Sequence, residues 1–212
     1  LKENRYEKVK NINKKIYKIL LKYYKSEDKI TDFGCANGEL LYFLEKKLLS
    51  PSLTGIEVNP KLIKKAKKNV KSAFFKQGSI VKKKIIKKNF TNISICIGVL
   101  GIFDNFEKIL NNLIYWTKPS GKVIFQVLLN NDPYDVNIKY SHSNKWTING
   151  PKYYESGWNV FSKQTLKNFF KKIPSIKKVK FYEHKISYEQ KKNKLDPLRS
   201  WTFLYDKKKK LT

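Results

Sequence analysis

The segment ITDFGCANGELL, residues 30–41, restricts the possible folds more than any other part of the chain. Its apolar start predicts a short strand over 30–33, and the run that begins at Glu39 predicts a helix. Between them, Gly34, Ala36 and Gly38 place small residues at alternate positions of the connecting turn. A strand, a glycine-rich turn and a helix together present backbone N–H groups to a nucleotide-like ligand, and a Cβ atom would block that approach. The segment therefore predicts a ligand site at the carboxyl end of the first strand.

The rest of the chain alternates between strand-like and helix-like patterns. Seven segments have the apolar runs expected of strands: 30–33, 53–58, 73–76, 93–100, 123–129, 178–186 and 200–205. Five segments have the periodicity of amphipathic helices: 6–24, 39–49, 60–70, 106–116 and 162–171. This alternation predicts an α/β doubly wound, Rossmann-like fold with a seven-stranded, mostly parallel sheet and helices on both faces.

Two parts of the chain fall outside this regular pattern. Residues 1–29 contain a leading helix before the first strand, and residues 130–160 form an irregular insert rich in Asn, Asp, Pro, Tyr and Ser. A long irregular segment in a compact domain is usually a functional loop. With 212 residues, the chain is expected to form a single domain over 1–212 that includes both parts.

The sequence contains none of the patterns expected of a membrane span, a disulfide framework or a metal site. No apolar run is long enough to cross a bilayer, and no leader peptide precedes the first helix, so a cytoplasmic location is expected. Cys35 and Cys96 lie far apart, with no C-x-x-C spacing and no histidine companion. We therefore expect two buried thiols and no metal ion.

The net charge of +29 results from 46 lysine and arginine residues against 17 acidic residues. Such a surface attracts anions, including nucleic acids. Arg5 and Arg199 are the only arginines, however, and bases and phosphates are typically recognised by the bidentate guanidinium group. The composition therefore favours a general preference for acidic partners over a dedicated nucleic-acid-binding function.

The turn departs from the dinucleotide-binding pattern. That pattern requires G-x-G-x-x-G, and Glu39 stands where the last glycine would be, which disfavours a nicotinamide cofactor. Glu57 ends the second predicted strand, nineteen positions after Gly38. A carboxylate at this separation can accept hydrogen bonds from both hydroxyls of a ribose. The ligand is thus expected to contain a nucleoside.

Taken in order, these segments resemble the class I S-adenosylmethionine-dependent methyltransferases, of the type that acts on small molecules. DFGCANG resembles the first motif of that family, and GIEVNPKLIKKAKKN resembles the strand and helix that follow it. KQGSI, CIGVLGIFDN and WTKPSGKVIF resemble the later strands and loops, so the resemblance extends over about residues 30–129. It implies an enzyme that uses S-adenosyl-L-methionine and releases S-adenosyl-L-homocysteine, with residues 1–29 as a lid and 130–160 as the acceptor-recognition insert.

The resemblance also implies the residues that hold the cofactor. Asp32 would orient the ammonium group, and Glu57 would hold the ribose. Ser79 departs from the family pattern, because an acidic residue often bonds the adenine amine at that position. The full set implied for the cofactor is Asp32, Gly34, Cys35, Ala36, Asn37, Gly38, Glu57, Val58, Gln77, Gly78, Ser79, Ile80 and Gly98.

The methyl acceptor is indicated less directly. Methyl transfer needs a base only when the acceptor must lose a proton, and His142, in the insert, is the catalytic candidate for that role. The DPY sequence at 132–134 resembles a signature of base-methylating enzymes, but it follows the fifth strand where those enzymes have it after the fourth. We therefore expect a small, anionic, phosphorylated or sugar-derived acceptor, as in surface-polysaccharide modification.

Two alternatives remain open. One is an RNA or DNA methyltransferase, and the other is a non-catalytic binding protein on a methyltransferase fold. The sequence does not indicate the oligomeric state.

Overall fold

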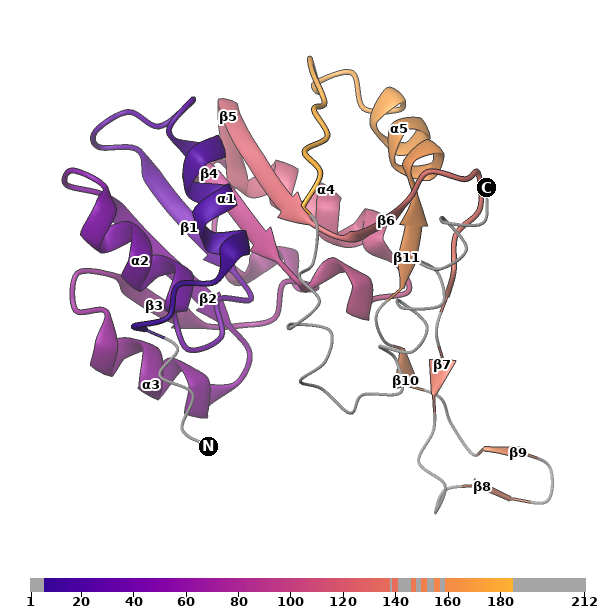
Figure 1. Ribbon diagram of the computed structural model, residues 1–212, viewed down its shortest axis with the longest axis horizontal. Helices are drawn as coiled ribbons and strands as arrows, with labels where there is room; N and C mark the ends of the chain where they lie inside the picture. Colours follow the sequence, from indigo (N-terminus) through magenta and orange to yellow (C-terminus); the bar gives the residue numbers. More distant parts are fainter. Residues whose placement is uncertain are drawn as a thin grey trace. The chain divides into compact units, whose positions relative to one another are not determined.

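The computed structural model describes residues 6–137, 139–140, 146–147, 150–151, 155–156 and 159–184 (Figure 1). The backbone divides into two compact units, Leu1–Leu129 and Asn130–Thr212. The boundary coincides with the start of the predicted insert at residue 130. That the whole chain forms one methyltransferase domain stays a prediction.

A five-stranded sheet forms the centre of the first unit. All neighbouring strands are parallel, and their order is β3-β2-β1-β4-β5. The chain moves outward from β1 to β3 and then returns to the other side of β1 with β4, so that a topological switch point lies between β1 and β4. The predicted α/β, Rossmann-like class is confirmed. The strands are β1 (Lys29–Phe33), β2 (Ser52–Glu57), β3 (Phe74–Gln77), β4 (Thr91–Ile97) and β5 (Thr117–Gln126).

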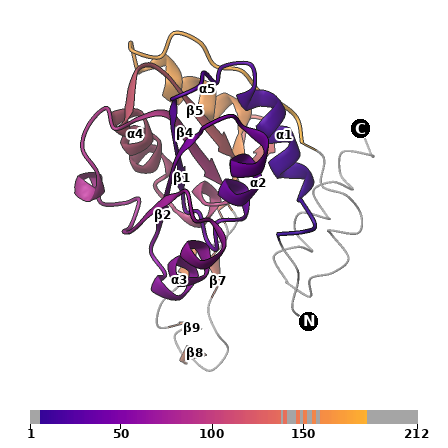
Figure 2. The ribbon, with the colours of Figure 1, turned by 90° about the vertical axis from the view of Figure 1, so that its left-hand side faces the viewer.

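Helices cover both faces of this sheet, as Figure 2 shows. Residues of α1, α2 and α3 share one buried cluster with the strands, whereas α4 packs on the opposite face. Right-handed crossovers require this arrangement, because the chain reverses its direction across the sheet after β3. The helical elements are α1 (Asn11–Leu20), α2 (Glu39–Lys47), α3 (Pro60–Asn69), α4 (Phe106–Trp116) and the 3-10 turns η1 (Lys83–Ile85) and η2 (Leu100–Ile102).

The core is apolar on both sides of the central strand β1. Ile30 packs with Leu41 and Leu44 of α2 in the cluster on one face. On the other face, the Phe33 ring stacks on the Trp116 ring of α4, with 4.8 Å between centroids. Successive residues of a strand point to opposite faces, so this burial on both sides fixes the register of β1 and the position of the turn that follows it.

The second unit contains short strands and one helix. In it, Asp135 accepts hydrogen bonds from Ser162 N and from Thr165 Oγ1, and Ser162 caps the helix by accepting from Thr165 N at 2.9 Å. The predicted helix over 162–171 is confirmed within one residue. The elements are β7 (Lys139–Tyr140), which pairs with β10 (Glu155–Ser156), β8 (Trp146–Thr147), which pairs with β9 (Gly150–Pro151), β11 (Val160–Ser162), α5 (Lys163–Lys171) and, at the boundary, β6 (Leu128–Asn130).

The strand count differs from the prediction. The described residues form a five-stranded sheet where seven strands were predicted, and residues 178–184 have no strand structure. A strand requires a hydrogen-bonded neighbour as well as a suitable composition, and the predicted partner, 200–205, lies outside the described residues.

Three elements have bounds that differ from the prediction more than the others do. The leading helix is shorter than the predicted 6–24, because Lys10 has extended backbone at the helix start. The fourth strand ends at Ile97, since Gly98 has a φ of +67° and turns the chain into η2. The fifth strand begins at Thr117, and Ser120, with a φ of +63°, lies in its irregular first part. None of the helices in the described ranges is long and apolar enough to cross a membrane.

Candidate functional site

The turn after β1 has an unusual backbone that its sequence explains. Gly34, Ala36 and Gly38 have φ values of +79°, +48° and +81°. The N–H groups of Gly34 and Cys35 both donate to Ile56 O of β2, at 2.8 and 3.0 Å, and Gly38 N donates to Cys35 O at 2.8 Å. The turn is therefore held by the chain itself. Because these N–H groups already have acceptors, the turn is poorly suited to binding a phosphate, which agrees with the absence of a dinucleotide pattern.

The space beside two of the small residues is occupied by protein side chains. A Cβ atom on Gly34 would lie 2.5 Å from Val99 Cγ2, and one on Gly38 would lie 3.2 Å from the Cβ of Ala66. These residues thus allow the turn to pack against the loop after β4 and against α3. Their small size was predicted to admit an approaching ligand, and the sequence pattern gave no indication of Val99.

Glu57 lies beside this turn at the end of the neighbouring strand β2. It is 8% exposed. Its Oε2 accepts from Ala36 N at 3.0 Å, and its Oε1 accepts from Val58 N at 2.8 Å and from Asn59 N at 2.9 Å. The carboxylate therefore ties the turn after β1 to the end of β2, and Oε2, which has one donor, keeps capacity for a further one.

Asp32 is the second carboxylate of the site, near the end of β1. It is 4% exposed, and no donor or cation from the described residues pairs with its side chain. Burial, followed by the charge of Glu57, raises the pKa of Asp32 to about 7. A buried carboxylate beside another carboxylate lacks a counter-charge, and a bound cation would supply it.

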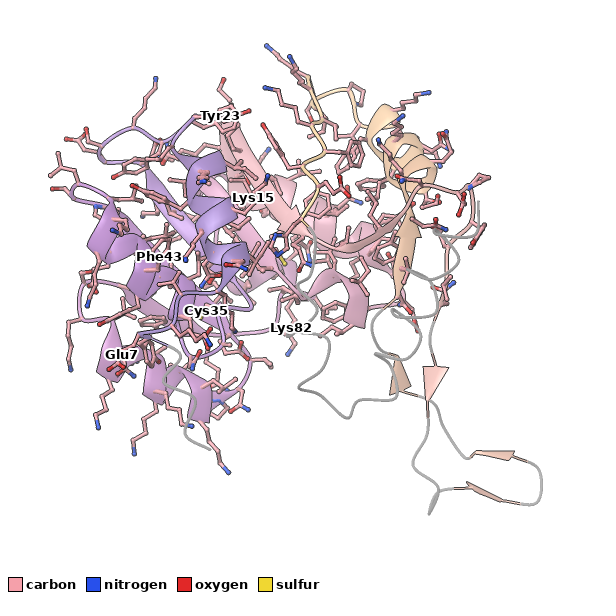
Figure 3. The ribbon with its side chains drawn as sticks, in the orientation of Figure 1. Glu7, Lys15, Tyr23, Cys35, Phe43 and Lys82 are labelled. Atoms are coloured by element: carbon pink, nitrogen blue, oxygen red, sulfur yellow. The ribbon has the colours of Figure 1, made fainter. Side chains whose placement is uncertain are left out.

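Within the described residues, neither a reactive thiol nor a metal-binding cluster adds to the site. Burial raises the pKa values of both Cys35 and Cys96, as expected for inert core thiols. Cys35 belongs to the apolar cluster under the turn, where Figure 3 labels it. No group of three or more His, Cys, Asp and Glu side chains in the described ranges could hold a metal ion.

The segment after β3 is fixed next to Glu57. Gly78 N donates to Glu57 O at 2.9 Å, and the Gln77 side chain donates to Val58 O at 3.1 Å. A Cβ atom on Gly78 would lie 3.1 Å from Ile85 Cγ2, so the segment packs closely on η1. The segment therefore lies at the carboxyl ends of the strands, on the same side of the sheet as Asp32 and the turn.

Asn112 of α4 holds the same segment from the other face of the sheet. Its side-chain nitrogen donates to Ile80 O at 2.8 Å, while Ser79 O accepts from Lys82 N at 2.9 Å. The sequence analysis missed Asn112. The available signal was a polar residue within the apolar face of a helix, since buried polar groups are almost always hydrogen-bonded.

Of the two predicted site residues that remain, Gly98 is described by the structure and His142 is not. Gly98 ends β4 and is followed by Val99, which contacts the turn at Gly34. His142 lies outside the described residues. The structure therefore brings together the turn, Glu57, Asp32, segment 77–80 and Gly98 at the carboxyl ends of the strands, where open α/β sheets bind their ligands.

The segment before α1 is bound to the turn and to the start of α2 by side-chain contacts. The Tyr6 hydroxyl donates to Asn37 O at 2.6 Å and accepts from the Asn69 side chain at 3.1 Å. Lys10 Nζ forms an ion pair with Glu39 Oε2 at 2.7 Å. Both contacts fall within the segment that was predicted to act as a lid over 1–29.

Replacing Tyr6 with Phe is expected to destabilise the protein by about 1 kcal/mol, because one hydrogen bond to the turn and one from Asn69 of α3 are lost. If the turn contributes to ligand binding, affinity should also fall several-fold. The matched control is Tyr17→Phe, since Tyr17 Oη donates to Lys47 O at 3.3 Å, away from the turn. Chemical denaturation and calorimetry check both effects. Equal losses of affinity in the two variants would contradict a specific role for Tyr6.

Comparison with known proteins adds the following findings. A family model described as methyltransferase domain matches residues 3–173. The PH0226 protein from Pyrococcus horikoshii is 19% identical, with a TM-score of 0.54 over 74% of this chain and 78% of that chain. A Galdieria sulphuraria protein assigned as a sarcosine dimethylglycine methyltransferase is 15% identical, with a TM-score of 0.50 over 60% of this chain and 46% of that chain. No curated protein is significantly similar in sequence.

A third structure has a lower TM-score. It is a Methanococcus maripaludis protein assigned as an S-adenosyl-L-methionine-dependent methyltransferase, 16% identical, with a TM-score of 0.49 over 53% of each chain. The chain therefore spans about half the length of the Galdieria and Methanococcus proteins. The similarity to the Pyrococcus and Galdieria structures supports the fold.

Proposed function

Because this chain belongs to the methyltransferase domain family, with S-adenosylmethionine as cofactor and S-adenosylhomocysteine as product, we propose that it methylates a small anionic acceptor. The acceptor would be phosphorylated or sugar-derived, such as a precursor of a surface polysaccharide. We further propose a cytoplasmic setting, where the buried thiols Cys35 and Cys96 would stay reduced.

The observation that carries the cofactor assignment is the Asp32 carboxylate, buried beside Glu57 without a counter-charge. S-adenosylmethionine contains an ammonium group, and pairing it with Asp32 would relieve the repulsion between the two carboxylates. We assign the ribose hydroxyls to Glu57, whose Oε2 accepts a hydrogen bond from Ala36 N of the turn. Segment 77–80 would flank the adenine, and Gly98 would line the pocket around the sulfonium.

Methyl transfer requires little from the protein beyond alignment of the acceptor with the methyl group. When bound, the cofactor supplies an electrophilic methyl group, and transfer occurs by in-line displacement. A phosphate or carboxylate oxygen is already anionic at neutral pH and needs no base. The net charge of +29 supports such an acceptor, because a positive field raises the rate of encounter with anions. His142 would serve as base only for an acceptor that has to lose a proton.

The test combines binding and transfer. Calorimetry with S-adenosylhomocysteine should give saturable binding, and a labelled methyl group should pass to a member of a panel of phosphorylated sugars. A Kd weaker than about 1 mM would contradict the proposal. Transfer to a polynucleotide and to no small molecule would contradict the proposed acceptor class.

His142→Ala separates the two kinds of acceptor. Removal of a general base typically lowers the rate by about 10²-fold or more, whereas an anionic acceptor should react at nearly the wild-type rate. For the acceptor class proposed here, we expect the rate to be retained. A large loss with a hydroxyl acceptor would assign the base role to His142.

A further inference from the structure

The lysines of α3, β3 and η1 form a surface that the methyltransferase site does not use. We call it the β3-edge surface and define it by twelve exposed residues: Lys61, Lys64, Lys65, Lys67, Lys68, Lys71, Lys76, Lys82, Lys83, Lys84, Lys87 and Lys88. Figure 3 shows nitrogen-tipped side chains extending from α3 away from the sheet and labels Lys82.

General lysine enrichment does not account for this surface by itself. No Asp or Glu occurs between Glu57 and Asp104, although at the average frequency of acidic residues this stretch would contain about four. Within the described part of the chain, none of the twelve ammonium groups forms an ion pair. Lys83 lies over the Tyr115 ring, 4.2 Å from its centroid. Glu45 borders the surface, where it accepts a hydrogen bond from Ser72 N at 3.1 Å.

An exposed aromatic ring lies on β3, close in sequence to two of these lysines. Phe74 is 61% exposed and belongs to β3, the edge strand of the sheet, between Lys71 and Lys76. Its neighbour Phe75 is buried against the α3 face, so Phe74 points to the opposite face. An exposed ring on the strand at this lysine-rich edge of the sheet meets the two requirements of single-stranded nucleic-acid binding, stacking with bases and attraction of the phosphates.

The extent and curvature of the surface favour a polymer. Helix α3 alone is about 15 Å long, which exceeds the length of one phosphorylated metabolite. The lysines also continue around the edge of the sheet, because α3 covers one face while Trp116 Nε1 of α4, on the other face, donates to Lys83 O at 2.9 Å. A flexible strand can follow such an edge, whereas a flat bilayer would contact only one side of it.

From these observations we infer that the β3-edge surface binds single-stranded nucleic acid through lysine–phosphate contacts and stacking on Phe74. This inference does not rest on the acceptor proposed above. Binding is measured without cofactor or methyl acceptor, so its failure would leave the methyl-transfer test unaffected.

The probe is a fluorescein-labelled oligouridylate of about 20 nucleotides, long enough to cover an OB-fold-sized site, titrated with the full chain in fluorescence anisotropy. The test variant is Lys64→Gln/Lys71→Gln/Lys76→Gln, which removes one charge of α3 and the two that flank Phe74 in the sequence. The matched control is Lys167→Gln/Lys171→Gln/Lys172→Gln in α5 and just after it, which changes the net charge equally. A third variant, Phe74→Ala, removes the exposed ring, and circular dichroism checks that every variant is folded.

The β3-edge triple variant should weaken binding about tenfold and lower the slope of log K against log[salt] by about 2, since three phosphate contacts are lost. Phe74→Ala should weaken binding about fivefold or more without changing that slope. The α5 variant should change affinity less than about threefold. Equal losses in the two triple variants would overturn the inference, as would an unaffected Phe74→Ala variant. Preferential binding to phosphatidylserine vesicles through the same lysines would overturn it in favour of a membrane.

Discussion

Replacing Asp32 with Asn should weaken the binding of S-adenosylmethionine at least about 30-fold while stabilising the ligand-free protein. Affinity should fall because the proposed partner of the ammonium group loses its charge. Stability should rise because the buried carboxylate, which faces Glu57 without a counter-charge, is replaced by a neutral group of the same shape. Calorimetry and denaturant titration measure the two effects on the same preparations.

The gain in stability should depend on pH in a defined direction. Folding raises the pKa of Asp32 from its ordinary value of 3.8 to about 7. Between these values the folded state binds more protons than the unfolded state, so this residue makes wild-type stability fall as pH rises from about 4 to about 7. The advantage of Asp32→Asn should therefore be small near pH 4 and reach the order of 4 kcal/mol above pH 7. A constant difference across this range would contradict the assignment of the pKa.

The affinity of the wild-type protein should depend on pH as well. In the proposed arrangement, binding requires ionised Asp32, so affinity should increase as pH rises through about 7 and fall again where the ligand's amine loses its proton, near pH 8. Asp32→Asn should lack the first of these transitions. The surface control is Asp28→Asn, because Asp28 accepts from Lys25 N in an exposed turn and should leave both transitions unchanged.

Replacing Gly34 with Ala should destabilise the protein by about 2–4 kcal/mol, for two separate reasons. The φ of +79° is unfavourable for a residue with a Cβ atom, and that atom would lie 2.5 Å from Val99 Cγ2. The double variant Gly34→Ala/Val99→Ala removes the second cause only. It should recover about 1–2 kcal/mol relative to the prediction for Gly34→Ala alone.

Chemical denaturation of the single and double variants completes the cycle, with Val99→Ala as the control. Losses of stability that simply add in the double variant would show that the contact with Val99 does not matter. Gly38→Ala should cost less than Gly34→Ala, because its Cβ atom would approach Ala66 only to 3.2 Å.

Hydrophobic periodicity was sufficient to predict the elements of the first unit. Helix α4 (Phe106–Trp116) was predicted with the correct bounds, because its apolar face and its capping residue Asn105 agree. Strand β4 was predicted to end three residues too late. The apolar run continues to Leu100, but the positive φ of Gly98 ends the strand, and composition does not reveal the backbone angle of a glycine.

The candidate site was predicted less completely than the fold. Carboxylates at strand ends can be located in a sequence, and Asp32 and Glu57 do lie at the carboxyl ends of two neighbouring parallel strands. Contacts between segments distant in the sequence were not predictable, as with Asn112, which holds the backbone at Ile80. The role of small side chains was also ambiguous, because a missing Cβ atom at Gly34 can leave room either for a ligand or for Val99.

The internal hydrogen bonds of the turn after β1 have a kinetic consequence. The N–H groups of Gly34, Cys35, Ala36 and Gly38 all have acceptors within the chain, so the turn holds its shape before any ligand arrives. A preformed site avoids the slow step of loop ordering, and the association rate should be near those of other rigid sites. Substitutions at the carboxyl ends of these strands should therefore shorten the lifetime of the protein–ligand complex and leave the rate of encounter almost unchanged.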